Sequence, residues 1–379
     1  MSRLLIFHPA LAPYRLDFFN ALGKIFDCKV VFLQRQNDEL LIQQQELLKD
    51  ATFRYEYLDQ HFKLFGRDIN VGYWQTIRAF QPDVVLCCEY TLSLWATLAY
   101  RTLHRSKFRL YTMTDDSQDM AEARQGGKRR RQMYLLRHID GLVTISPEMA
   151  NWYKQNSPAR RLFSFPIIRD EERFRAEQSL ITPFAATHVS RWQLEGKKVC
   201  LFVGRFVALK NLRALIEAFA AVVREEEEKD SLRLVLVGQG EEKENLMKAA
   251  EENGVADKVL FPGAYGGHEL MAWYRTASVF VLGSWQEAFG AVTNEALLSG
   301  CRVMVSRYAG SRSLVTPENG RVFDSLNADD FQQTLASLLA TAMPTPANGF
   351  ERPSLMPVSF QERIRALSEF LQYNRYIAE

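Results

Sequence analysis

The sequence predicts an α/β fold of two doubly wound, Rossmann-like domains that face a central cleft. The chain has 379 residues, about twice the usual length of a single domain. In both halves, short apolar runs alternate with longer segments of helical period. Because each run is almost continuously apolar, it is typical of a strand buried on both faces of a parallel sheet. Alternating strands and helices favour one such sheet in each half.

The first half contains five strand-like runs with helical patterns between them. The runs are RLLIFHP (3–9), CKVVFL (28–33), DVVLCC (83–88), FRLYTMT (108–114) and GLVTIS (141–146). Helical spacing of apolar residues is found in YRLDFFNALGKIF (14–26) and TLSLWATLAYRTLH (91–104). We therefore predict a first Rossmann-like domain over residues 1–168.

The second half repeats this rhythm. Its strand-like runs are KVCLFVG (198–204), LRLVLVG (232–238), KVLFPG (258–263), SVFVLGS (278–284) and CRVMVS (301–306), and its crossover helices are predicted in 211–225 and 242–254. They predict a second domain over residues 196–359, with the boundary within 168–196, where apolar periodicity lapses. The closing helix, within 360–379, precedes no strand and is expected to pack back on the first domain.

Composition excludes several classes of protein. A formal net charge of +2 argues against a dedicated nucleic-acid binder. The five cysteines lack metal-ligand spacing and lie mostly in apolar runs, which indicates buried, reduced thiols in a cytoplasmic protein. The first apolar run is too short for a signal peptide, and no window reaches the ~18–20 apolar residues of a spanning helix. We expect a soluble or peripheral protein.

One basic segment leaves two interpretations open. GKRRRQMYLLRH (127–138) is basic and then apolar, which suits a solvated amphipathic helix. The same pattern also suits a contact with an anionic membrane surface, for example at the inner face of the membrane.

Loops that follow strands in the second half carry groups suited to phosphate. Ligands of doubly wound folds collect at the carboxyl ends of strands. The loop VGRFVALKN brings Arg205 and Lys210 within reach of one anion, although a structural ion pair is the alternative. Tyr265, in the glycine-containing loop FPGAYGG (261–267), could lie against a flat base, and a plain turn is the competing interpretation.

The stretch SWQEAFGAVTNEALLSG (284–300) is the most informative. It places Glu287 before an expected helix start and Glu295 two turns inside the helix. Free backbone N–H groups at such a start attract an anion. Eight largely helical residues would span about 12 Å, the scale of a sugar–diphosphate–ribose unit. The two acids could then accept hydrogen bonds from hydroxyl groups at opposite ends of this unit. The alternatives are an exposed loop acid for Glu287 and a buried cap or an ion pair for Glu295.

Together these residues resemble the retaining glycosyltransferases of family 4, the glycosyl transferases group 1 with the GT-B fold. The resemblance spans most of the chain and is strongest over residues 199–323. It rests on GRxxxxK (204–210), the VGQGEE loop (237–242), the Glu287–Glu295 block and PENGRVFD (317–324). The segment APYRLDFFNAL (12–22) is similar to the opening of many family members that build envelope polysaccharides.

The resemblance implies a role for each matching residue. Arg205 and Lys210 would bind the diphosphate and, with Glu287, form the catalytic set. Glu287 would hold the hydroxyl groups of the transferred sugar, and Glu295 the ribose. The remaining implied donor-binding residues are Gly204, Gly238, Gly263, Ala264, Tyr265, Ala288, Phe289 and Gly290.

The first domain departs from the family pattern. HPALAPYR replaces the family's glycine-rich loop, so Tyr14 and Arg15 either contact phosphate or only begin a helix. Where many relatives carry a His-Asp pair, this chain has Asp115 and Asp116. Asp115 could contact the sugar or the acceptor hydroxyl group, or be only a solvated acid at the end of a strand. SRYAGSRS (306–313) lacks the acidic residue common in relatives. Tyr14, Arg15, Asp115 and Asp116 are therefore the candidates for contacts with the acceptor or for other roles of the first domain.

The resemblance implies a hexosyltransferase that moves a sugar from a nucleotide-sugar donor to a glycan or lipid-linked acceptor with retention of configuration. The expected setting is the synthesis of cell-envelope polysaccharide, such as lipopolysaccharide, capsule or exopolysaccharide. No metal and no cofactor are required, since fixed positive groups assist the leaving phosphate. The alternatives are a GT-B-fold nucleotide-sugar epimerase and a non-catalytic nucleotide-sugar binding protein.

Overall fold

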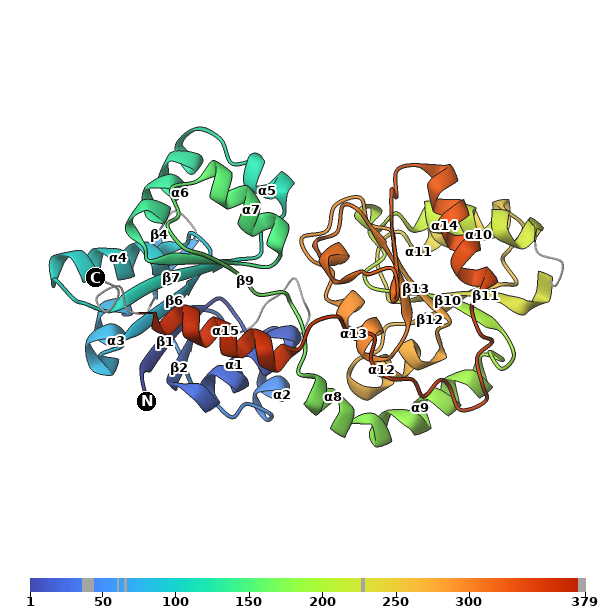
Figure 1. Cartoon of the computed structure of the whole chain (residues 1–379), viewed down its shortest axis with the longest axis horizontal. Coiled ribbons are helices and arrows are strands. Elements are labelled where there is room, and N and C mark those ends of the chain that lie inside the picture. Colours follow the sequence, from blue (N-terminus) through green and yellow to red (C-terminus); the bar gives the residue numbers. More distant parts are fainter. Residues whose placement is uncertain (36–43, 60, 65–66, 226–228, 374–379) are drawn as a thin grey trace. The chain divides into compact units, whose positions relative to one another are not determined.

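The computed structural model describes residues 1–35, 44–59, 61–64, 67–225 and 229–373. The chain divides into two compact units (Figure 1). Unit 1 comprises Met1–Ile167 and Phe360–Glu379, and unit 2 comprises Ile168–Ser359. Each unit is built around a parallel sheet of its own.

Within the described residues, unit 1 has a seven-stranded parallel sheet of order β3-β2-β1-β6-β7-β8-β9. The strands are β1 (Arg3–His8), β2 (Asp27–Phe32), β3 (Arg54–Tyr57), β6 (Val84–Cys88), β7 (Arg109–Thr114), β8 (Gly141–Thr144) and β9 (Leu162–Ser164), and β4 (His61–Leu64) and β5 (Arg67–Asn70) form a separate hairpin. The helices are α1 (Pro13–Ile25), α2 (Gln44–Leu48), α3 (Tyr73–Phe80), α4 (Leu92–Leu103), α5 (Gln118–Glu122), α6 (Gly126–His138), α7 (Pro147–Asn156) and α15 (Phe360–Gln372). The order of the strands reverses between β1 and β6.

Helices cover both faces of this sheet, which explains why its strands are almost continuously apolar. Alternate residues of one strand serve opposite faces: Leu5 and Phe7 of β1 belong to a core shared with α3, α4, α6 and α7. On the other face, α1 packs against α15. There the Phe165 ring meets those of Phe18 and Phe360 edge to face, at centroid distances of 5.0 and 6.2 Å.

Unit 2 has, within the described residues, a six-stranded parallel sheet of order β12-β11-β10-β13-β14-β15. Its strands are β10 (Lys198–Val203), β11 (Leu232–Val237), β12 (Val259–Gly263), β13 (Val279–Leu282), β14 (Arg302–Ser306) and β15 (Gly320–Phe323). Its α-helices are α8 (Glu171–Ala176), α9 (Gln178–Arg191), α10 (Leu212–Glu225), α11 (Lys243–Glu252), α12 (Gly267–Thr276), α13 (Val292–Leu298) and α14 (Ala328–Ala340), with 3-10 turns η1 (Ala208–Lys210), η2 (Lys229–Ser231) and η3 (Gly310–Leu314). This order is that of a dinucleotide-binding Rossmann fold, with the reversal between β10 and β13.

These two sheets confirm the predicted α/β class with two doubly wound domains. The ten predicted strands all occur, within three residues at either end. The sequence did not predict β3, β9 and β15, all three of which are edge strands of three or four residues, nor the hairpin strands β4 and β5. The predicted cleft depends on how the two domains are placed relative to one another, and it stays a prediction.

The division of the chain falls at one end of the segment in which the boundary was expected. Residues 168–196 contain α8 and α9 and belong to unit 2. They are held there because Arg275 of α12 donates hydrogen bonds to Gln178 O and Thr182 Oγ1 of α9 at 3.3 and 2.7 Å. The closing helix lies in unit 1, where Phe370 packs against Tyr111 of β7. The last part of the predicted 360–379 helix, 374–379, lies outside the described residues.

Two further expectations concern the chain as a whole. All five cysteines are buried and unpaired, as predicted for reduced thiols. Over the described residues, no helix combines the length and apolar character needed to cross a bilayer. The basic segment 127–138 is helical, as α6, with Lys128, Arg130, Arg131 and Arg137 exposed.

Candidate functional site

The predicted cation and the predicted acid of unit 2 form an ion pair at the point where its strand order reverses. Lys210 ends the loop after β10, and Glu287 lies in the loop after β13, the neighbouring strand. The Lys210 ammonium contacts the Glu287 carboxylate, and Ser284 Oγ donates to the same oxygen at 3.3 Å. Both side chains are about one-fifth exposed, at 20% and 17%. They are therefore held in place yet accessible.

The turn after Glu287 presents free backbone donors. In the part of the chain that the structure describes, no acceptor pairs with the N–H groups of Ala288, Phe289 and Gly290. The turn is fixed by its carbonyls instead, since the Phe289 carbonyl accepts from Ser311 N at 2.7 Å. Gly290 has a φ of +91°, and a Cβ there would lie 2.5 Å from a Leu282 methyl group, so only glycine fits. Free N–H groups beside an ammonium favour an anion or a polar hydroxylated ligand.

Arg205 supplies a second cation at the same edge of the sheet. It follows Gly204 at the end of β10, is exposed, and has no hydrogen-bond or ion-pair partner among the described residues. The backbone around it is packed against the loop after β11: Phe206 N donates to Gln239 O at 2.8 Å. A Cβ on Gly238 would lie 1.8 Å from the Gly204 carbonyl oxygen, so this approach requires glycine.

The loop after β12 continues this row of strand ends. Gly263 accepts from Gly238 N at 2.9 Å and has a φ of +100°. Ala264 is exposed, and the half-buried Tyr265 ring packs edge-on against Trp273 and His188, at centroid distances of 5.6 and 5.2 Å. Its contacts hold the ring in one position, which is what a surface for stacking would need.

Glu295 is not where the spacing argument placed it. Helix α13 begins at Val292, so Glu295 lies in its first turn and not two turns inside, and residues 288–291 are not helical. The helical rise therefore does not set the distance between the two acids. The Glu295 carboxylate accepts from Tyr274 Oη at 2.8 Å; burial raises its pKa, and the charge of Arg169 opposes this shift. With seven residues, α13 also adds little dipole at the turn.

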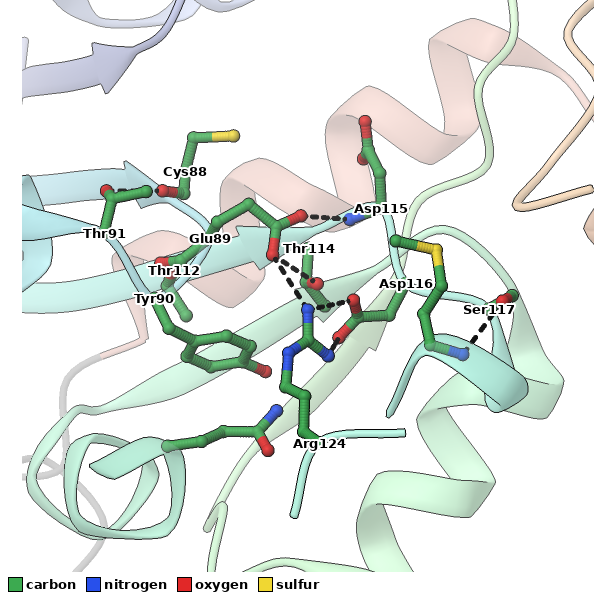
Figure 2. A network of polar contacts seen from close by, with 12 residues as sticks. Cys88, Glu89, Tyr90, Thr91, Thr112, Thr114, Asp115, Asp116, Ser117 and Arg124 are labelled. Atoms are coloured by element: carbon green, nitrogen blue, oxygen red, sulfur yellow. Dashed lines mark hydrogen bonds and ion pairs between the residues drawn. The ribbon is translucent and has the colours of Figure 1, made fainter. Parts of the chain in front are cut away.

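Unit 1 carries a second polar network at the carboxyl ends of its strands (Figure 2). Glu89 follows β6, the strand beside the reversal point of this sheet, and has a φ of +59°. Its carboxylate accepts from Asp115 N at 2.9 Å and from Thr114 Oγ1 at 3.1 Å. Burial and the nearby Asp116 and Asp115 charges raise the pKa of Glu89 to about 7, against the lowering effect of these hydrogen bonds.

Asp116 is fully occupied by protein groups. Arg124 forms a bidentate pair with it, at 2.6 and 2.5 Å, and Tyr153 Oη donates to it at 2.5 Å. Its side chain is 0% exposed. This surrounding does not support the predicted contact with an acceptor, because no oxygen of the carboxylate faces solvent.

Asp115 is the better placed of the two aspartates. Its side chain is 33% exposed, and one oxygen pairs with the buried Arg15 at 2.5 Å. Arg15 lies in the first turn of α1 and is 2% exposed, so it holds Asp115 in place and offers little surface to a ligand. The half-buried Tyr14 lies beside the Arg15 guanidinium, and burial together with the Asp115 charge raises the pKa of Tyr14.

Glu89 and Arg124 were absent from the sequence-based candidates. The signal for Glu89 was available, since it follows the predicted strand 83–88 and carboxyl ends of strands collect ligands. Arg124 follows no strand, and only the fold brings it to Asp116. For metals, no group of three or more His, Cys, Asp or Glu side chains able to hold an ion occurs among the described residues.

Comparison with known proteins gives a family match for the part of the chain that contains the Lys210–Glu287 pair. Residues 187–348 match the family model for glycosyl transferases group 1. The matched segment is less than half of the chain. It covers most of unit 2 and therefore includes every predicted donor-binding residue. A D-inositol 3-phosphate glycosyltransferase of Pseudarthrobacter chlorophenolicus is 33% identical to the chain over 141 residues, 36% of this chain and 33% of that protein.

The matches to curated relatives are partial, whereas those to solved structures span the chain. The chain spans about a third of the length of the first curated relatives that it matches. Sucrose-phosphate synthase from Thermosynechococcus elongatus is similar in fold, with a TM-score of 0.65, 18% identity and coverage of 97% of this chain and 95% of that one. Anabaena HepE in complex with UDP and glucose gives a TM-score of 0.68, 15% identity and coverage of 98% and 95%. At these identities the likeness establishes the fold.

Proposed function

We propose that the protein transfers a hexose from a nucleotide-diphosphate sugar to a glycan or lipid-linked acceptor, with retention of configuration and without a metal. The observation that carries the proposal is the meeting of Lys210, Glu287 and the free amides of 288–290 at the reversal point of the unit 2 sheet, within the segment that matches glycosyl transferases group 1. Charge-complementary groups at this position suit a diphosphate flanked by hydroxyl groups.

Each group has a role in the proposed complex. Arg205 and Lys210 bind the diphosphate and offset the charge that grows on the leaving phosphate. Glu287 accepts hydrogen bonds from hydroxyl groups of the transferred sugar, and the N–H groups of 288–290 donate to it. Glu295 faces the ribose hydroxyl groups, and Tyr265 borders the base. The protein's fixed cations thus take the part that a metal ion plays in other transferases.

The reaction exchanges one bond at the sugar's anomeric carbon. The bond to the phosphate oxygen breaks as the bond to the acceptor oxygen forms on the same face, through an oxocarbenium-like state. The acceptor hydroxyl gives its proton to the leaving phosphate oxygen, so no separate base is consumed. Asp115 of unit 1, partly exposed and held by Arg15, is the proposed contact of the acceptor.

The proposed setting is the synthesis of envelope polysaccharide at the cytoplasmic side of the membrane. Two relatives support an acceptor linked to lipid or glycan: an alpha-monoglucosyldiacylglycerol synthase of Streptococcus pneumoniae, and, by fold alone, a lipopolysaccharide outer core galactosyltransferase. The exposed basic side chains of α6 provide a surface for a peripheral contact with anionic lipid.

The test begins with donor binding and ends with the product. Thermal unfolding with UDP-, GDP- and dTDP-sugars should identify one donor that raises the melting temperature. That donor is then incubated with alkyl glycosides, D-inositol 3-phosphate or lipid-linked glycans, with and without EDTA, and the product's anomeric configuration is read by NMR. We expect retained configuration and full rate in EDTA. An inverted product, loss of rate in EDTA, a changed sugar without acceptor, or binding without turnover would each contradict the proposal.

A further inference from the structure

Unit 1 contains a large basic cavity at the amino ends of its strands, opposite the edge that carries Glu89 and Asp115. Its volume is about 1050 Å³. It is formed by the segments that lead into β6, β7, β8 and β9, by the last turns of α3 and α4, and by Tyr373 after α15. Strand β7 has six residues, so its two ends are separated by about 20 Å. The cavity is therefore distinct from the network at the carboxyl ends.

The charges around this cavity are strongly unbalanced. Among the lining residues that the structure describes, the basic side chains outnumber the acidic ones by seven to two; they are Arg78, Arg101, Arg105, Lys107, Arg109, Arg160 and Arg161, against Asp83 and Asp140. Both acids already have protein partners. Asp83 accepts from Arg3 N at 2.8 Å, and Asp140 pairs with Arg101 at 2.5 Å. The chain as a whole carries a formal charge of only +2, so this is a local concentration of charge.

Helix ends account for only part of this excess. Arg78 and Arg101 lie in the last turns of α3 and α4, where cations stabilise the carbonyl end of a helix. Arg105, Lys107 and Arg160 lie outside the helices and strands and are exposed, and their side chains have no hydrogen-bond or ion-pair partner in the described part of the chain. Several like charges around one concavity repel each other and raise the local concentration of anions.

Two features of the lining favour a bound ligand over loosely held counter-ions. Arg109, at the start of β7, has a buried guanidinium nitrogen, Nη1, without a partner in the described structure. Arg161 is held in place, since it donates to Phe370 O at 3.0 Å and lies over the Tyr373 ring, which is itself 48% exposed. A fixed guanidinium beside an accessible aromatic ring and an unsatisfied donor resembles the wall of a binding pocket.

We propose that this cavity binds a ligand that carries several phosphate groups. Guanidinium forks match phosphate oxygens in bidentate geometry, and the excess of five positive charges is more than one phosphate monoester neutralises. The volume is at the upper end of the roughly 300–1,000 Å³ typical of small-molecule pockets, which suits a nucleotide-sized polyanion or a phosphorylated headgroup. The site goes beyond the proposed transfer reaction and does not depend on it.

A pair of charge-matched triple variants tests this proposal. In the cavity variant, Arg105→Gln, Lys107→Gln and Arg160→Gln remove three exposed, unpartnered charges. In the control, Lys24→Gln, Lys154→Gln and Arg365→Gln remove three exposed charges from α1, α7 and α15 of the same unit. Because none of the three cavity side chains has a protein partner, the melting temperature of the cavity variant should stay near that of the natural protein.

Two probes separate the sources of phosphate. Inositol hexakisphosphate, titrated by calorimetry, represents a free polyanion. Phosphatidylcholine vesicles that contain phosphatidylinositol 4,5-bisphosphate, with pure phosphatidylcholine vesicles as the neutral comparison, represent a phosphorylated headgroup. We expect at least one probe to bind about tenfold to hundredfold more weakly to the cavity variant, and nearly unchanged to the control and to Lys210→Ala. No binding of either probe to the natural protein, equal losses in both triple variants, or loss only in Lys210→Ala would overturn the proposal.

Discussion

Lys210 and Glu287 illustrate how two residues 77 positions apart become one chemical unit. Neighbouring parallel strands, β10 and β13, deliver them to the same edge of the sheet, and each side chain keeps about one-fifth of its surface exposed. The pair holds an ammonium and a carboxylate in mutual contact. A donor that offers phosphate to one and hydroxyl groups to the other can replace that contact at little cost in desolvation.

We expect Lys210→Ala and Glu287→Ala each to lower the rate of transfer by at least about 100-fold, since each removes a charge that meets the reacting groups in the proposed complex. Stability should fall by only about 1–2 kcal/mol, because the remaining charge stays partly solvated. Initial rates and urea unfolding measure the two effects. Lys248→Ala, 74% exposed on α11, is the control. Near-normal turnover in both variants would show that the reaction centre lies elsewhere.

Glu89 gives unit 1 a specific dependence on pH. Its pKa is raised to about 7 in the folded protein, so the folded state binds more protons than the unfolded state between about pH 4.5 and 7. Stability contributed by this group is therefore lost as pH rises through that window, and the loss is complete above pH 7. The Glu89→Gln variant has no ionisable group at this position, so it should not show this loss of stability.

We expect the stability of Glu89→Gln, relative to the natural protein, to be more favourable at pH 8 than at pH 4. The raised pKa corresponds to a change of about 3 kcal/mol in the free energy of unfolding between the two pH values. We reduce this figure to about 2 kcal/mol because the Glu89 side chain is 30% exposed. Urea unfolding at both pH values measures it. Glu46→Gln, an exposed carboxylate of α2, controls for the loss of one acid. Equal differences at the two pH values would mean that Glu89 ionises normally.

At the level of elements, sequence and structure agree best where burial dictates pattern. Strands covered on both faces must be apolar throughout, so β1, β10 and their neighbours were predictable from composition alone. Edge strands lack that requirement, and β3 was missed. The start of α13 also escaped prediction, because it depends on packing between the 288–290 turn and η3, which no local pattern records. Glu89 itself could have been predicted from its place after the strand 83–88, but its partners in and after β7 and Arg124 are brought to it only by the fold.

The loops at the carboxyl ends of β10 and β11 pack tightly against each other, because their backbones are in direct contact. Gly238→Ala should cost more than about 3 kcal/mol, because its Cβ would lie 1.8 Å from the Gly204 oxygen at a φ of +146°. Gly254→Ala is a matched control: its φ is +72°, but nothing lies within 4 Å of the added atom, and we expect a cost of about 1 kcal/mol. Urea unfolding separates the two costs, and similar values would argue against tight contact of these loops.

At the level of the whole molecule, two sheets with separate cores make two folding units. Unit 1 has its own buried cluster around Leu110 and Leu142, and unit 2 has a Rossmann sheet with the predicted donor-binding residues. A ligand that binds only one unit stabilises that unit directly. The unfolding temperatures of the two units, measured with and without a ligand, can therefore show which unit binds that ligand.

Calorimetry should resolve two unfolding transitions, only one of which responds to the donor nucleotide. At 100 times its dissociation constant, the nucleotide adds about 2.7 kcal/mol to the unit it binds, which corresponds to roughly 5–10 °C for a unit of this size. Leu110→Ala creates a cavity in the core of unit 1 and should lower the other transition, leaving the nucleotide-sensitive one in place. Lys210→Ala should reduce the nucleotide's effect without moving the transition of unit 1. A single transition that shifts with both changes would mean that the units unfold together, and a shift of the Leu110-sensitive transition by nucleotide would place the donor in unit 1.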